Sequence, residues 1–317
     1  MKNVIFITIC LLLGSLVICG CAACNKTKCR QAKNRKATCE QSAAETFVKS
    51  HPNTDFYPGW RLGTQAYTFK EFTFFEAVDK AASLGLHWIE GYSNQIVGGK
   101  YDKVKTHYTM SEEVKQAIKD KLDDAGVTLI AYGVITPGGG EKEWRKLFEF
   151  CSEMGIDTIT SEPKAEQIDT IEQLCKEYHI KLAIHNHPKP SRYWNPEKVL
   201  EACKGRSKWI GACADTGHWM RSGIKAVEGL RMLKGRINSL HLKDLNKFGT
   251  KEAHDVVWGT GKADFEQMLK ELHDQGFKGM ISIEYEYNWE NSVPDLRKCI
   301  LAYKKAVAKL APGGCAW

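Results

Sequence analysis

The chain has 317 residues, of which 43% are hydrophobic and 26% charged, ordinary values for a globular protein with one large core. The formal net charge is +7, but much of the excess lies in one basic segment near the start: Lys26, Lys28, Arg30, Lys33, Arg35 and Lys36. Because this charge is local, it argues against a nucleic-acid partner for the whole protein and suits a segment close to an anionic membrane surface.

The first twenty residues have the pattern of an export signal. Lys2 gives a positive start, and Val4 to Ile18 form an apolar run that is too short and wrongly flanked for a membrane span. Its end, Leu16-Val17-Ile18-Cys19-Gly20-Cys21, resembles a bacterial lipobox with Cys21 as the lipidated residue, although Cys19 stands where Ala or Ser is usual. We expect a signal peptide over residues 1–20 and a lipoprotein of the bacterial cell envelope, periplasmic or at the cell surface. A secreted protein without the lipid is the alternative.

The remaining chain divides into a tether and one folded domain. Residues 21–58 are polar and basic without clear periodicity, whereas residues 59–317 alternate short apolar runs with longer amphipathic stretches. In chain order, each predicted strand precedes a predicted helix: Arg61–Thr68 and Phe74–Leu84, His87–Tyr92 and Glu112–Ala125, Thr128–Val134 and Glu143–Met154, Thr158–Glu162 and Ile168–Tyr178, Lys181–His187 and Pro196–Ala202, Gly211–Thr216 and Ile224–Leu233, Ile237–Lys243 and Asp264–Gln275, Met280–Tyr287 and Leu296–Leu310.

Eight such units in roughly 250 residues predict a closed (β/α)8 barrel, the TIM barrel. An open doubly wound sheet is the alternative, but it usually has fewer strands, and no glycine-rich dinucleotide motif follows the first strand. Gly85, Gly126, Gly155 and Gly276 each follow a predicted helix, where glycine adopts the left-handed conformation that ends a helix without strain.

Ionisable residues gather where the predicted strands end: Glu90, Glu162, His185, His187, Asp215, His218, His241, Lys243, Glu284 and Glu286. The active site of a (β/α)8 barrel is built at this carboxyl-terminal face. Burying so many ionisable groups together is costly unless a cation or hydrogen bonds compensate. Mixed carboxylate and imidazole ligands therefore predict one divalent metal ion, with Mn²⁺, Co²⁺, Zn²⁺, Fe²⁺ and Mg²⁺ all possible.

From Gly59 to about Leu310 the chain resembles the xylose isomerase-like barrel superfamily, which includes ketose 3-epimerases, inosose dehydratases and sugar-phosphate isomerase/epimerase-like proteins. The resemblance rests on five motifs in the second half of the barrel, in the correct order: Leu182-Ala183-Ile184-His185-Asn186-His187, Asp215-Thr216-Gly217-His218, Leu240-His241-Leu242-Lys243-Asp244, Gly259-Thr260-Gly261 and Gly279-Met280-Ile281-Ser282-Ile283-Glu284.

The resemblance implies the metal ligands. In the epimerase branch, Asp, His and Glu on the last three strands bind the metal, and they correspond to Asp215, His241 and Glu284. The fifth-strand Glu of that branch, which also acts as an acid/base, is His185 in this chain. The expected ligands are therefore these four residues, with Glu162 as a further carboxylate.

Four further residues are candidates for catalysis. His187 and Glu286 are alternative bases. His218 occupies a position that touches substrate in the resembling family, or else it caps a loop. Lys243 binds a substrate oxygen or neutralises Asp244.

Substrate binding is assigned to Glu90, Trp219 and Trp258. Together with Tyr92 and Trp289, the two tryptophans form walls that stack on a sugar, or else they pack the rim.

These residues suit removal of a proton next to a sugar ketone, because a cation polarises the ketone and stabilises the enediolate. Return of the proton gives epimerisation or isomerisation, and we expect a sugar isomerase/epimerase. Elimination of a β-substituent from a keto-sugar or a 3-keto-glycoside, by a lyase or dehydratase, is the alternative. A sugar-binding lipoprotein without catalysis is the candidate from another class. Phosphate-binding features are not evident, so the expected partner is a free or glycosidic carbohydrate.

The lipid anchor gives a direct test. In the motif Leu16–Cys21, Cys21 is the cysteine that follows both the apolar run and the small residue Gly20, so we expect it to carry the lipid. The Cys21→Ala variant should therefore be lost from the membrane fraction. Fractionation of cells that express the wild-type and variant chains measures this. Unchanged membrane association of the variant would contradict the prediction.

Overall fold

The computed structural model describes residues 56–310, so the expected signal peptide, Cys21 and the predicted tether up to residue 55 lie outside the described residues. Eight parallel strands close into a barrel in the order β1-β10-β9-β8-β7-β6-β5-β2, and β1 also pairs with β2. Their bounds are β1 Trp60–Gln65, β2 Trp88–Gly91, β5 Thr128–Tyr132, β6 Thr158–Ser161, β7 Lys181–His185, β8 Ile210–Asp215, β9 Ile237–Leu242 and β10 Gly279–Ile283. The predicted (β/α)8 fold is confirmed, because an open sheet would leave two strands unpaired on one side.

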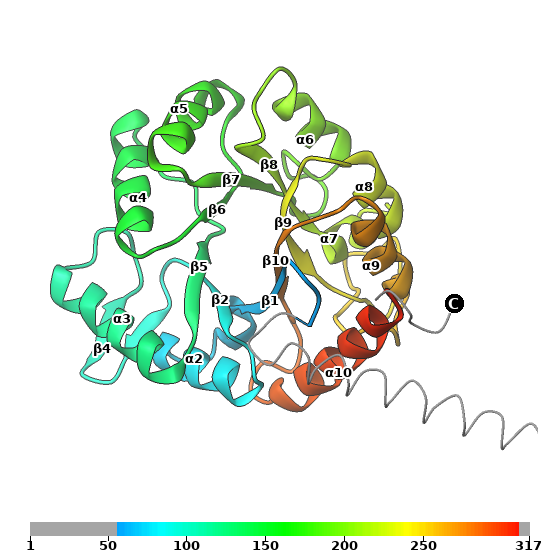
Figure 1. Ribbon diagram of the computed structural model, residues 1–317, viewed down its shortest axis with the longest axis horizontal. Helices are drawn as coiled ribbons and strands as arrows, with labels where there is room; N and C mark the ends of the chain where they lie inside the picture. Colours follow the sequence, from blue (N-terminus) through cyan, green and yellow to red (C-terminus); the bar gives the residue numbers. More distant parts are fainter. Residues whose placement is uncertain (1–55, 311–317) are drawn as a thin grey trace, which may run out of the picture. The chain divides into compact units, whose positions relative to one another are not determined.

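The helices form a ring outside the strands (Figure 1). They are α2 Phe74–Ser83, α3 Glu112–Ala125, α4 Glu141–Glu153, α5 Ile168–Tyr178, α6 Pro196–Cys203, α7 Thr216–Arg221, α8 Ala226–Met232, α9 Phe265–Asp274 and α10 Val293–Leu310, with 3-10 turns at Ala66–Phe69 and Ala165–Gln167. Every predicted helix is present, two of them with the predicted bounds. None of the helices in the described part of the chain combines the length and the apolar character needed to cross a membrane.

Local sequence explains where these helices start and stop. Thr73 caps α2: its hydroxyl accepts a hydrogen bond from the backbone N–H of Glu76, whose carboxylate accepts one from the backbone N–H of Thr73. The four glycines expected in the left-handed conformation all adopt it, with φ between +63° and +72°. Each lets the chain turn back from a helix into the next buried strand.

Two elements were not predicted from the sequence. The antiparallel hairpin of β3 (Ile96–Gly98) and β4 (Tyr101–Lys105) lies outside the barrel sheet, and most of β4 is exposed or half-buried, so it carries little hydrophobic pattern. Helix α7 follows β8 directly, and the Asp215 side chain accepts from the backbone N–H of His218 at 2.7 Å. This cap turns the chain sharply at the barrel mouth.

The strands end earlier than predicted where they enter the polar mouth. Strand β7 ends at His185 and β10 ends at Ile283, two and four residues before the predicted ends. Below that level the strands are apolar and buried on both faces, as expected for a parallel sheet covered by helices. The core therefore supports a ring of polar residues at one end of the barrel.

The left-handed glycine after α3 can be tested by stability. Gly126→Ala should lower the free energy of unfolding by about 1 kcal/mol, because a Cβ is strained at φ +63° even though no atom lies within 4 Å of it. Gly126→Asn should lose less, since asparagine tolerates this conformation better. Urea unfolding measures both.

The matched control is Gly138→Ala, which introduces a Cβ into open space without a positive φ. It should change the free energy of unfolding by no more than about 0.5 kcal/mol. An equal loss in Gly126→Ala and Gly138→Ala would show that backbone conformation is not the cause.

Candidate metal centre and active site

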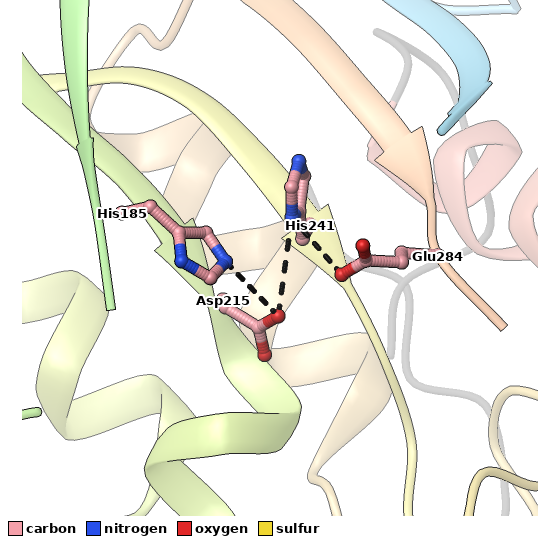
Figure 2. A group of neighbouring side chains, drawn as sticks. All are labelled: His185, Asp215, His241 and Glu284. Carbon is pink, nitrogen blue, oxygen red and sulfur yellow. Dashed lines mark ion pairs between the residues drawn. The ribbon is translucent and has the colours of Figure 1, made fainter. Parts of the chain in front are cut away.

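Four buried side chains meet at the carboxyl ends of neighbouring strands: His185 from β7, Asp215 from β8, His241 from β9 and Glu284 after β10 (Figure 2). One ligand atom from each lies within 4.8 Å of all the others. Strand pairing places Asp215 directly opposite His241, so the barrel register brings the ligands together.

The geometry of these four side chains suits binding of a cation better than hydrogen bonding among themselves. The His241 Nδ1 atom lies 3.0 Å from Glu284 Oε2, and Asp215 Oδ2 lies 3.6 Å from His185 Nε2. Yet these four atoms are buried and have no hydrogen-bond partner of good geometry among residues 56–310. Buried polar atoms without partners are costly, and a divalent ion would satisfy all four at once. Two imidazole nitrogens and two carboxylate oxygens are a suitable set for Zn²⁺, Mn²⁺, Fe²⁺ or Co²⁺.

The other nitrogen of each histidine is held by a carboxylate. His241 Nε2 lies 3.0 Å from Glu90 Oε2, and Glu90 also accepts from the hydroxyls of Ser282 (2.6 Å) and Thr160 (2.7 Å). A metal-binding histidine usually has such a partner, which fixes the ring and its tautomer. Glu90 is fully buried, so its expected role in substrate binding is corrected: it orients His241.

Glu162 holds two imidazoles with one oxygen. Its Oε1 accepts from Nδ1 of His185 (3.1 Å), from Nδ1 of His187 (2.6 Å) and from the backbone N–H of His187 (2.9 Å). Glu162 lies outside the four-residue cluster, but with His185 and His187 it forms a second group whose ligand atoms could hold a metal ion. Because an ionised carboxylate only accepts hydrogen bonds, each of the two imidazoles carries a proton on Nδ1, and each has a lone pair on Nε2 when it is neutral.

Charge compensation shifts the protonation of these groups. Burial alone lowers the pKa of His185, but the nearby carboxylates of Asp215 and Glu162 outweigh burial and raise the pKa to about 9. Burial opposes ionisation of Glu162 too, yet the two histidines hold its pKa well below the usual range. A metal ion that binds His185 would therefore displace a proton from the imidazole.

Lys243 lies among the carboxylates of the site and is fully buried. Its Nζ atom is 2.7 Å from Glu284 Oε2, 2.9 Å from Asp215 Oδ2 and 3.3 Å from Glu286 Oε1. The alternative that it neutralises Asp244 is wrong, because the Asp244 carboxylate accepts the backbone N–H groups of Gly259, Gly261 and Ala263 at 2.8–2.9 Å. Lys243 compensates the site carboxylates and does not line the opening.

A cavity of about 430 Å³ opens above these residues. It is lined by Gln65, Tyr67, Tyr92, Gly133, Val134, His185, His187, His218, Glu284 and Glu286. Three of the four expected catalytic residues therefore face this space. The side chain of His187 is half exposed, whereas His218 is buried and stacks against the His187 ring, with centroids 5.2 Å apart.

Glu286 lines the cavity but is held by two cations. Arg221 Nη1 donates to Glu286 Oε2 at 3.1 Å, and Lys243 Nζ lies 3.3 Å from Oε1. Both oxygens are thus engaged. His187, by contrast, is anchored through Nδ1 and leaves Nε2 without a partner that the structure records, which favours it over Glu286 as the proton acceptor.

The two predicted tryptophans do not reach the cavity. Trp219 has no exposed surface and packs its ring against Gly229, and Trp258 is 2% exposed and stacks on Phe265. The expectation that they stack on a sugar is therefore wrong, since neither ring has an open face. Tyr67 and Tyr92 line the cavity, and Trp289 contacts Tyr67 edge to face at 5.6 Å.

Several site residues were missed from the sequence. Gln65 is the last residue of β1 and Tyr67 lies just after it, and this position at a carboxyl end was the available signal. Gly133 and Val134 follow β5 in the same way. Arg221 comes six residues after Asp215, at the end of a helix that was not predicted, and nothing in the motif indicated its role.

The fold and the site define a closed (β/α)8 barrel with a buried His₂-Asp-Glu cluster at its carboxyl-terminal face that could hold a metal ion. Residues 78–303 match the family described as "Xylose isomerase-like TIM barrel", and the chain belongs to this family.

Curated relatives include inosose dehydratases. The one from Clostridium perfringens is 28% identical over 162 residues, which cover 46% of this chain and 48% of that protein. The chain thus spans about half the length of that relative. The one from Clostridium beijerinckii is 23% identical over 270 residues, covering 72% of this chain and 87% of that protein.

Solved structures share the fold. An uncharacterised protein from Parabacteroides distasonis is 34% identical, with a TM-score of 0.64 and coverage of 80% of this chain and 100% of that one. The IOLI protein, which was solved with a bound zinc atom, is 18% identical, with a TM-score of 0.62 and coverage of 78% and 98%. The latter likeness shows the fold alone.

Metal content tests the cluster. His241→Ala should lose most of the bound metal, because it removes one ligand and leaves Glu90 without its imidazole partner. Glu90→Gln should weaken metal affinity about 10- to 100-fold, since it removes the charge that orients His241. Elemental analysis after dialysis against a graded chelator series measures both effects.

The control is His107→Ala, which removes a histidine between β4 and α3, outside the cluster. It should keep the wild-type metal content. Full metal content in a folded His241→Ala protein would rule out the cluster as the binding site.

Proposed function

We propose that this protein is a metal-dependent lyase that removes a proton next to a ketone of a sugar or related polyol and expels a β-substituent. The observation that carries the proposal is His187. Its Nδ1 is anchored on Glu162, its side chain is half exposed, and it lines the cavity next to the cluster of His185, Asp215, His241 and Glu284.

His185, Asp215, His241 and Glu284 would hold the metal. A divalent cation at such a site polarises a carbonyl oxygen and stabilises the negative charge that develops when the neighbouring proton leaves. The carboxylates of Glu90 and Glu162 keep the two ligand imidazoles in the required orientation.

His187 takes the α-proton through Nε2. The resulting imidazolium is stabilised by Glu162, whose Oε1 already accepts its Nδ1–H at 2.6 Å. As the C–H electron pair forms the new double bond, the β-carbon–oxygen bond breaks. The imidazolium returns its proton to the departing oxygen, so a hydroxyl compound leaves and His187 is neutral again.

Elimination is favoured over epimerisation because His187 alone can remove the α-proton and then protonate the departing oxygen. Epimerisation through two bases requires a second proton acceptor across the substrate, and Glu286 has both oxygens engaged by Arg221 and Lys243. The inosose dehydratase relatives, by their names, catalyse losses of water, which supports the same outcome.

The cavity suits a small carbohydrate. Its aromatic side chains, Tyr67 and Tyr92, offer faces or edges for a sugar ring, while histidines and carboxylates supply polar contacts. If the chain is exported and anchored at Cys21, as its first residues suggest, a free or glycosidic keto-sugar is the substrate class to expect. Localisation stays a proposal that the Cys21 variant tests.

Sugar isomerisation or epimerisation is the second candidate. It begins with the same proton abstraction, and Glu286 lines the cavity beside His187, where release from Arg221 would free an acceptor. The product separates the two candidates: an unsaturated carbonyl compound indicates elimination, and a sugar of unchanged composition indicates epimerisation or isomerisation.

The key experiment is turnover in deuterated water. Inososes, keto-hexoses and 3-keto-glycosides are incubated with metal-loaded protein, and NMR detects deuterium at the α-carbon and any unsaturated product. His187→Gln, which still offers Glu162 a donor, should slow this exchange by about 10² to 10⁴-fold with metal content unchanged. The loss follows from removal of the proton acceptor.

Glu286→Gln is the matched comparison, since it alters the other cavity-facing candidate. It should keep α-exchange far above the level of His187→Gln. Equal exchange in wild type and His187→Gln would eliminate His187 as the base. A substrate that is turned over without any exchange would instead indicate metal-assisted hydrolysis.

A further inference from the structure

Arg221, the last residue of α7, connects the cavity to the buried charges beneath it. Its Nη1 donates to Nδ1 of His218 at 2.9 Å and to Glu286 Oε2 at 3.1 Å. Its Nη2 donates to Asp255 Oδ2 at 3.1 Å, and its Nε donates to the Ala253 carbonyl at 3.2 Å. The side chain is only 9% exposed, so every arm of the guanidinium is committed.

The contact with His218 determines where the imidazole carries its proton. A guanidinium has only donors and does not lose a proton in proteins. A nitrogen that faces it at 2.9 Å must therefore accept. His218 is then neutral, with its lone pair on Nδ1 and its proton on Nε2.

His187 has the opposite arrangement. Its Nδ1 faces the acceptor Glu162 Oε1, so its proton is on Nδ1 and its lone pair is on Nε2. The two rings stack with centroids 5.2 Å apart and an interplanar angle of 29°, and both line the same cavity. The Glu162 carboxylate and the Arg221 guanidinium therefore impose opposite tautomers on the two stacked rings.

We propose that Arg221 is a positioning residue that fixes His218 as a neutral Nε2–H donor beside the acceptor His187. The role of this Nε2–H toward a substrate rests on the proposed function. His218 lines the cavity, and its Nε2 lies 3.6 Å from Asp215 Oδ2, so the Nε2–H donates at the level of the ligand cluster, to an oxygen of the bound carbohydrate, while His187 handles the proton.

Lysine would serve this purpose less well than arginine. The planar fork reaches His218, Glu286 and Asp255 together, whereas one ammonium on a flexible chain cannot hold three partners in fixed directions. Asp255 is 1% exposed and anchors the far arm, so the guanidinium keeps its angle toward His218. The arrangement depends on shape as well as charge.

The test is the histidine tautomer in the zinc-loaded protein, read by two-dimensional ¹H–¹⁵N NMR of ¹⁵N-histidine-labelled chain. His218→Gln identifies the His218 signals by their loss. In the wild type, His218 should show an unprotonated Nδ1 and a protonated Nε2. Arg221→Met should convert part or all of His218 to the Nδ1–H tautomer or to a mixture, and Arg221→Lys should restore part of the wild-type pattern.

Turnover provides the second reading. Arg221→Met should reduce kcat by roughly 10²-fold or more, as expected when a fixed donor is lost, with partial recovery in Arg221→Lys. The control is Arg231→Met on α8, whose exposed guanidinium pairs with Glu271; it should leave the tautomer and turnover unchanged. If Arg221→Met does not fold, the His218 tautomer in the wild type and in Arg221→Lys still tests the inference.

A wild-type His218 that carries its proton on Nδ1, or on both nitrogens, overturns the inference. So does a tautomer that stays the same in both Arg221 variants. The spectra need no substrate, so they separate this inference from the proposed function. An expected tautomer with no α-exchange on any keto-sugar refutes the proposed function alone.

Discussion

Mutual compensation of buried charge is the constraint on which this site depends. Asp215, Lys243 and His241 have no exposed surface, and Glu284 is 6% exposed, so water cannot stabilise their charges. Carboxylates, an ammonium and imidazoles must therefore stabilise one another, at distances set by the register of the strands. The barrel makes this feasible, because its strands end at one level and deliver one polar group each to the same point.

Orientation of the imidazoles follows from the same constraint. Every histidine of the site has one nitrogen tied to a group that either only accepts or only donates: Glu90 for His241, Glu162 for His185 and His187, and Arg221 for His218. The partner dictates which nitrogen is left for a metal, a proton or a substrate. Glu90, Glu162 and Arg221 thus determine the chemistry of the cavity, although none of the three is among the residues that line it.

The sequence allowed the barrel and most of the cluster to be predicted, because both depend on local order. Apolar strands, helices that end in glycine and polar residues at strand ends can all be recognised in a single sequence. A residue at the carboxyl end of a barrel strand, such as His241, must lie at the face where the other strands end. The roles of Glu90, Trp219 and Trp258 were misassigned because they depend on which face of an element meets which neighbour. Arg221 was missed because its partners lie 3, 34 and 65 residues away along the chain and meet only when α7 folds over the mouth.

The shared oxygen of Glu162 links two functions of this site. The same atom restrains an imidazole of the ligand cluster and the imidazole proposed as base. Neither ring can be adjusted alone: any change in the position of that carboxylate alters ligand geometry and proton transfer together. His185, His187 and Glu162 are therefore interdependent, and a design that gives this barrel mouth a different chemistry would have to redesign the three side chains together.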